Sequence, residues 1–153
     1  MALRLSALCL ALALATGCDG RPATAPPTTR PAVVDLQSAR LTLQTDKRAY
    51  RAGTPLTLML LLTNPDSTQS ARVEFPSSLH AEFAITDASG RMVWESPGPL
   101  AHLPVVTDIV IPPAGSRTYM ATATVPLPVG SYVARGTLCT ASPKKIEADF
   151  SVR

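Results

Sequence analysis

The 153-residue sequence has few of the residues on which catalytic and metal sites depend. It contains 2 histidines and 3 cysteines, and it has no Gly-x-Ser-x-Gly nucleophile segment and no glycine-rich phosphate loop. A structural zinc site requires four cysteine or histidine ligands in paired spacing, which this chain does not offer. We therefore predict no catalytic residue, no metal site and no cofactor, and we do not expect an enzyme.

Glycine, aromatic residues and runs of like charge are also scarce. The 8 glycines exclude collagen, and the net charge of +3 without a basic run argues against nucleic acid as a partner. Aromatic residues make up 5% of the chain, and most fall at positions expected in a core, which disfavours stacking on a carbohydrate. What remains is a small globular domain with a tail.

The first residues are typical of a bacterial lipoprotein signal. The apolar run Leu5–Ala15 is much shorter than the about 20 residues of a membrane-spanning helix, so it predicts a removable leader. Ala15-Thr16-Gly17-Cys18 fits a lipobox, which predicts a signal peptide over residues 1–17 and lipidation of Cys18, with palmitate among the acyl chains. Ordinary signal-peptidase cleavage with a free Cys18 is the alternative.

A proline-rich and threonine-rich segment follows the predicted lipid anchor. Residues 18–34 contain Pro22, Pro26, Pro27 and Pro31 and almost nothing bulky, which predicts an extended linker. The folded domain is predicted over residues 35–153. Lipidation would place it at the cell membrane or the outer membrane, facing the periplasm or the cell exterior, and the sequence leaves the leaflet open.

The folded part consists of short alternating runs separated by Pro, Gly, Asn and Asp, which predicts an all-β, two-sheet antiparallel sandwich of about 8–9 strands. The expected strands are Arg40–Thr45, Leu56–Thr63, Ala71–Phe75, His80–Thr86, Arg91–Glu95, Thr107–Ile111, Arg117–Val125, Ser131–Thr140 and Lys145–Val152.

Side-chain alternation assigns faces to several of these strands. Leu58–Leu62 is apolar on both faces, which predicts a central strand covered on both sides, and Pro55 and Pro65 leave little room for a helix as the alternative. Phe83 and Ile85 are expected to point into the core.

Further expectations concern the strand of Trp94, the turn that precedes it and the strand of Cys139. Trp94 is expected to join the core together with Met92, and Asp87–Gly90 is expected to form a tight hairpin turn. Cys139 is expected to be a small, half-buried residue, with a reactive thiol as the alternative.

The order of the turn and aromatic residues along the folded part resembles that of the BsuPI family of intracellular proteinase inhibitors. The string Asp-x-x-Gly-x-x-Val-Trp-x-Ser, here Asp87 to Ser96, is its most specific part. The other matching features are Tyr50-x-x-Gly53, Asn64 at the end of an apolar strand, Phe75-Pro76-Ser77-Ser78, Pro113 with Gly115, Tyr119, and Gly130-Ser131-Tyr132. The resemblance implies an immunoglobulin-like β-sandwich that binds a protease.

A substrate-like inhibitor presents a loop that is already ordered, because prior ordering lowers the entropy cost of association. Ser96–Pro104 is the candidate loop, with three prolines and the candidate protein-binding residues Leu100, Ala101, His102 and Leu103. Leu100 is expected to enter the apolar pocket of a serine (subtilisin-like) protease. Alternatively, Leu100 and Leu103 cap the open end of the sandwich.

Two functions therefore remain. The first is a lipid-anchored protein-binding domain that inhibits a serine protease. The second is a non-inhibitory adhesion or scaffold module of the cell envelope, because a sandwich fold by itself does not specify a function.

Overall fold

The computed structural model describes residues 32–36, 38–47, 49–97 and 103–153. In these residues the chain forms ten strands, which pair with one another in antiparallel fashion, so the predicted all-β sandwich is confirmed. No helix of this part of the chain has the length and hydropathy of a membrane span. The strands are β1 (Ala32–Asp35), β2 (Arg40–Thr45), β3 (Leu56–Thr63), β4 (Ala71–Phe75), β5 (Ala81–Asp87), β6 (Met92–Glu95), β7 (Thr107–Ile111), β8 (Ser116–Ala123), β9 (Gly130–Leu138) and β10 (Lys144–Val152).

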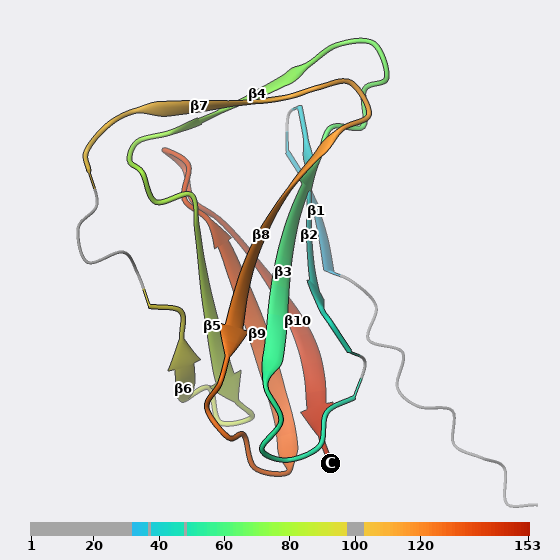
Figure 1. Cartoon of the computed structure of the whole chain (residues 1–153), viewed down its shortest axis with the longest axis vertical. Coiled ribbons are helices and arrows are strands. Elements are labelled where there is room, and N and C mark those ends of the chain that lie inside the picture. The colour runs from blue at the N-terminus through green and yellow to red at the C-terminus, as the bar shows by residue number, and fades with distance from the viewer. Residues whose placement is uncertain (1–31, 37, 48, 98–102) are drawn as a thin grey trace, which may run out of the picture.

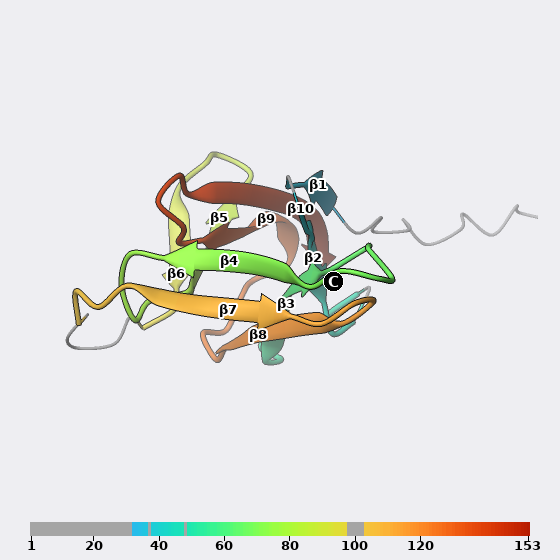
Figure 2. The same cartoon turned by 90° about the horizontal axis from the view of Figure 1, so that it is seen from above.

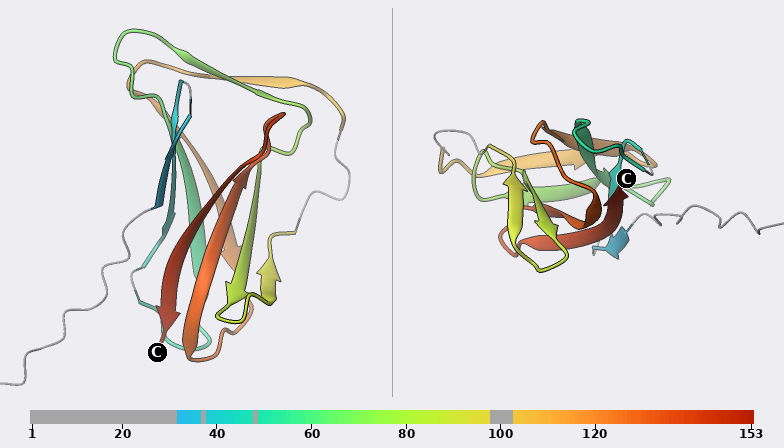
Figure 3. Two further views of the ribbon diagram at one scale, coloured as in Figure 1. Left: turned by 180° about the vertical axis from the view of Figure 1, so that it is seen from behind. Right: turned by 90° about the horizontal axis from the view of Figure 1, so that it is seen from below.

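Two four-stranded sheets pack face to face. One has the order β1-β2-β3-β8 and the other the order β10-β9-β5-β6 (Figure 1). The second sheet is seen from its outer side in the rear view (Figure 3, left). A third sheet, β4-β7, has two strands and crosses one end of the sandwich, which is clearest from above (Figure 2).

Alternation along the strands places the core between the two large sheets. In β3 the side chains of Leu56, Leu58, Leu60 and Leu62 are buried, and each intervening side chain is partly exposed. This period of two is the consequence of the pleat, which turns successive side chains to opposite faces. The expected inward orientation of Phe83 and Ile85 is confirmed by their burial.

Gly136 marks a place where the two sheets approach closely. A Cβ atom built on Gly136 would lie 2.9 Å from Cδ1 of Leu60 and 3.2 Å from Cδ1 of Leu43, which belong to the opposite sheet. The missing side chain therefore lets two leucines of the other sheet fill the space over β9.

The predicted hairpin turn between β5 and β6 is confirmed. Gly90 has a φ of 83°, and its N–H donates to the carbonyl of Asp87 over 2.9 Å. The carboxylate of Asp87 accepts hydrogen bonds from Ser89 and Arg91, and these bonds, that of the Ser89 hydroxyl foremost, lower the pKa of Asp87 to about 2.

Some expectations about strands were wrong. β3 is central in its sheet, but its outer face is not covered, because Met59 and Leu61 are partly exposed there. Met92 does not join the core and is 51% exposed, since it points outward at the register shift between β5 and β6, whereas Trp94 does pack against the core.

The number and ends of the strands also differ from expectation. β1 was not predicted, because a four-residue strand at the end of a proline-rich segment has too few residues to show alternation. It overlaps the last residues of the predicted linker and pairs with β2 from Ala32 to Asp35. β8 ends at Ala123, two residues before the predicted end, and the proline-containing segment follows it.

The buried apolar side chains of the described chain all lie between Ala39 and Val152. A fragment of residues 32–153 therefore contains this whole core together with the ten strands, and we expect it to fold by itself.

Candidate functional site

The candidate loop begins at Ser96, directly after β6. The N–H of Ser96 donates to the carbonyl of Phe83 over 2.8 Å, and the N–H of Phe83 donates to Oγ of Ser96 over 3.0 Å. One serine thus makes a backbone and a side-chain hydrogen bond to the same residue of β5. This pair fixes the first end of the loop on the sheet β10-β9-β5-β6.

The other end of the loop is held in the same manner by a second serine. The N–H of Ser78 donates to the carbonyl of Leu103 over 3.1 Å, and the N–H of Leu103 donates to Oγ of Ser78 over 3.2 Å. Nearby, the hydroxyl of Thr107 lies 3.4 Å from the carbonyl of Ser77, which it can reach as a donor. The segment from β4 to β5 is therefore the support of the second end.

The predicted contact residues Leu100, Ala101 and His102 lie outside the described residues, as does Cys18. Leu103 is described, and its side chain is 62% exposed. Neither the contact role of Leu100 nor its alternative role as a cap over the sandwich is therefore tested.

The chain that follows Leu103 presents an exposed apolar surface. Val105, Val106 and Val110 are each more than half exposed, as is Leu103. Residues 103–106 are not paired with another strand, and they carry no charge. Exposed, uncharged apolar segments of this kind are typical of surfaces that bind another protein.

His80 lies directly before β5 and contacts both β4, through Phe75, and β8, through Tyr119. Its ring packs on Phe75, with 4.4 Å between ring centroids, and meets the ring of Tyr119 edge-on at 6.1 Å. Its Nε2 lies 3.0 Å from the hydroxyl of Thr107. Burial and, to a smaller extent, the positive charge of Arg117 lower the pKa of His80, so the neutral ring is favoured at this position.

Cys139 directly follows β9 and is partly exposed, as are Val133, Arg135 and Thr137, with which alternation groups it. Burial, and secondarily the charge of Glu82, raise the pKa of the Cys139 thiol to about 11. The thiol is therefore protonated at neutral pH, which is unfavourable for a nucleophile or a redox centre. The small, half-buried role is the one that its surroundings support.

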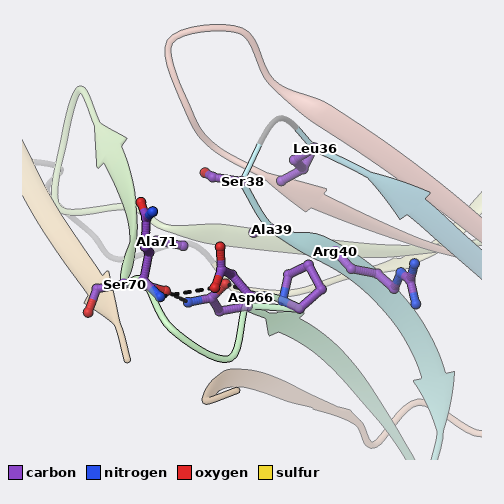
Figure 4. A pocket seen from close by; sticks show the side chains of 10 residues that line it. Leu36, Ser38, Ala39, Arg40, Asp66, Ser70 and Ala71 are labelled. Carbon is purple, nitrogen blue, oxygen red and sulfur yellow. Dashed lines mark hydrogen bonds between the residues drawn. The ribbon is translucent and has the colours of Figure 1, made fainter. Parts of the chain in front are cut away.

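A pocket of about 400 Å³ lies between the β1-β2 turn and the segment after β3 (Figure 4). Its carboxylate, that of Asp66, accepts hydrogen bonds from the N–H and hydroxyl of Thr68 and from the N–H of Gln69, which lower its pKa. The carboxylate is thus engaged by its own loop.

Asn64 lines the same pocket. It is buried, and its Nδ2 lies within donor distance of the carbonyls of Gln69, Ile111 and Pro112. Asn64 thereby ties the end of β3 to the turn between β7 and β8, which is a structural role. Among the residues that the structure describes, no group of three or more acidic, histidine or cysteine side chains is placed to hold a metal ion.

Sequence reasoning missed the anchoring serines Ser78 and Ser96, although both stand in the segments that carry the family resemblance. The signal that was available is their position, since each lies close to one end of the candidate loop. Their function requires a partner on another strand, which no local pattern reveals.

A family model described as "BsuPI: Intracellular proteinase inhibitor" matches residues 43–143. No curated protein matches the chain. Of the solved structures that are similar, Spo0M, a sporulation control protein from Bacillus subtilis, has 11% identity and a TM-score of 0.47, covering 77% of this chain and 50% of that one. This chain thus covers half of Spo0M.

The C-terminal domain of wzt has 9% identity and a TM-score of 0.46, covering 83% of this chain and 81% of that one. A beta-glucosidase from Listeria innocua has 12% identity and a TM-score of 0.39, covering 74% of this chain and 16% of that one. At such identities and scores these structural likenesses carry no functional argument.

Proposed function

Since the chain belongs to the BsuPI family of intracellular proteinase inhibitors, we propose that it inhibits a serine protease of the subtilisin type through the loop of residues 96–104. The observation that carries the proposal is the paired anchoring of the loop by Ser96 at one end and by Ser78 at the other. Ends that are fixed before binding reduce the entropy that the loop loses in the complex.

The contact itself is assigned to Leu100, with Leu103 and the exposed valines after it as secondary contacts. Leu100 precedes Ala101, so an apolar pocket of the protease can accept its side chain, whereas Leu103 precedes Pro104, which lacks an N–H group and disfavours cleavage. The proposal therefore places the primary contact at Leu100.

We further propose that the protein acts from a membrane to which the acylated Cys18 attaches it. The family description refers to intracellular inhibitors, whereas residues 1–17 predict export, so the target is proposed to be a protease of the cell envelope. In cells, Cys18→Ala should leave an unprocessed precursor without an acyl label. Normal acylation of that variant would contradict the lipid anchor.

The inhibitory function is tested by titrating the fragment 32–153 against a subtilisin-class protease, while following residual protease activity and the integrity of the fragment together. Inhibition with an intact fragment is expected. Leu100→Asp should abolish inhibition without changing the thermal midpoint, because the proposal assigns Leu100 to the contact with the protease and not to the core. The matched control is Val129→Asp, which changes an exposed apolar residue far from the loop in sequence.

The anchors are tested separately with Ser96→Ala and Ser78→Ala. Both variants should inhibit more weakly and be cleaved within the loop faster than the parent fragment, whereas Ser116→Ala on β8 should behave like the parent. Inhibition that survives Leu100→Asp would refute the contact. Absence of inhibition by an intact, resistant fragment would favour the non-inhibitory adhesion or scaffold module.

A further inference from the structure

The side chains that the structure describes on the outer face of the sheet β1-β2-β3-β8 are almost free of charge. The strand register places the outward side chains in cross-strand rows, among them Val33-Thr42-Leu61-Thr118 and Gln44-Met59-Met120. The outward side chains that the structure describes on these strands are Val33, Arg40, Thr42, Gln44, Thr57, Met59, Leu61, Thr63, Ser116, Thr118, Met120 and Thr122. Arg40 is the one charged residue among them, and it lies in the row at one end of the face, where the register pairs it with Asp35 of β1.

Three of the four apolar members of this face are neighbours in space, and the fourth, Val33, is separated from Leu61 by Thr42. Leu61 and Met59 occupy adjacent rows of β3, and Met120 lies directly opposite Met59 on β8. Val33 is 52% exposed and Met120 is 67% exposed, so the apolar surface is open to water. Around them lie threonines, which accept burial more readily than charged residues do.

From these features we infer that the uncharged face, defined by the twelve residues above, is an interface between two copies of this chain. The inference is independent of the proposed function. A membrane surface would favour lysine and arginine around an apolar face, and Arg40 alone does not provide them. A strongly charged partner would gain no ion pairs here, whereas an identical neutral face meets no repulsion.

The two copies can be related by a two-fold axis that lies in the plane of the interface and runs perpendicular to the strands. This axis places each cross-strand row of one copy over a row of the other copy. It places the Leu61 row over the Met59 row of the second copy, and it brings Arg40 to the threonine row at the far end, away from the other Arg40. Such an isologous contact closes after two copies. Two sheets can pack in this way with their strands within about 30° of each other.

The size of the face sets the strength of the association. Strands lie about 4.8 Å apart and rise about 3.3 Å per residue, so the strands β1, β2, β3 and β8 have a flat footprint of roughly 400 Å². Side chains make the accessible surface of each face larger than its flat footprint. Two such faces would therefore bury about 1,000 Å² of accessible surface in total, which is at the lower end of the range for specific interfaces. A reversible dimer is therefore expected.

The test is sedimentation velocity of the fragment 32–153 over a concentration series from about 1 µM to about 500 µM, the range in which a small interface associates. The parent fragment should pass from monomer to dimer. Met120→Lys and Leu61→Lys should each weaken dimerisation at least about tenfold, because each buries a charge opposite an apolar row.

The matched control is Thr137→Lys, which adds the same charge to the outer face of the other sheet, opposite Glu82. It should leave the dimer intact. All variants are first checked for a cooperative thermal transition, and Met120→Lys, at an exposed position of an edge strand, keeps the test valid where Leu61→Lys does not fold. A parent fragment that stays monomeric, a dimer that tolerates Met120→Lys, or equal loss in Thr137→Lys would overturn the interface.

Discussion

The two large sheets differ on their outer faces and agree on their inner ones. The outer face of the sheet β10-β9-β5-β6 carries six charged residues among those described, namely Glu82, Glu95, Arg135, Lys145, Glu147 and Asp149. On the outer face of the sheet β1-β2-β3-β8, Arg40 is the one charged residue among the side chains that the structure describes. Both inner faces are made of buried apolar side chains.

The difference between the two sheets shows that the inner and the outer positions of a strand meet different requirements. The inner positions must be apolar for the sandwich to form, since burial of apolar surface is the main favourable contribution to folding. The outer positions are free of that requirement, so their composition reflects what lies outside them. Charges suit a face in water, and the near absence of charge suits a face that becomes covered.

The largest expected effect concerns the inner faces and tests whether they are equivalent. Leu60→Ala in β3 and Phe150→Ala in β10 each remove a buried side chain, and each should lower the free energy of unfolding by about 3 to 4 kcal/mol through lost burial and a cavity. Denaturant unfolding of the fragment 32–153 measures both.

Met120→Ala, on the outer side of β8, is the control and should cost less than about 0.5 kcal/mol at concentrations where the chain is monomeric. A loss below about 1 kcal/mol for only one of the two core variants would break the equivalence of the inner faces.

The intermediate effect concerns His80, which packs against Phe75 of the sheet β4-β7 and Tyr119 of the sheet β1-β2-β3-β8. Its pKa is lowered from 6.5 by burial and then by Arg117, so the unfolded chain binds a proton at a higher pH than the folded chain does. Stability should therefore be constant above about pH 7.5 and should fall as the pH is lowered through 6.5.

Thermal midpoints of the fragment between pH 8 and pH 5 check this dependence. His80→Gln should flatten the midpoint profile in this range, whereas His102→Gln, which changes the second of the 2 histidines, should retain its slope. A parent profile that rises on acidification would show that His80 is stabilised in its charged form.

The smallest expected effect is the salt dependence of stability, which should differ between the two outer faces. On the charged face Arg135 pairs with Glu147 across β9 and β10 at 2.7 Å. Because both side chains are open to water, Arg135→Ala should cost at most about 1 kcal/mol at low salt, and the loss should shrink at high salt. Thr118→Ala on the uncharged face should show no such salt dependence. Equal salt dependence of the two variants, measured by denaturant unfolding, would remove the electrostatic distinction between the faces.

Local patterns predicted most of the strands. β2, β3, β4 and β7 have the predicted ends, because each is a clear alternating run between turn residues. The pattern failed for β1, which is too short to alternate, and for the outer face of β3, where Met59 and Leu61 were expected to be covered. A strand sequence shows that a face is apolar, but it does not show whether a second layer of the same chain reaches it.

The candidate site was predictable in part. The proline-rich loop and the exposed Leu103 follow from composition, whereas the anchors Ser78 and Ser96 do not, because each bonds to a residue brought close only by folding. The exposed apolar segment after Leu103 was likewise not foreseen.

The sequence by itself determined the all-β class, the spacing of the strands and the family, since these depend on alternation, turn residues and short motifs. Tertiary structure decided which strands share a sheet, which outer face lacks charge, and how the loop is held at both ends. These features depend on contacts between residues far apart in the chain, such as the pairing of β3 with β8 and of Ser78 with Leu103. Such contacts form only when the whole core closes, and no local propensity encodes them.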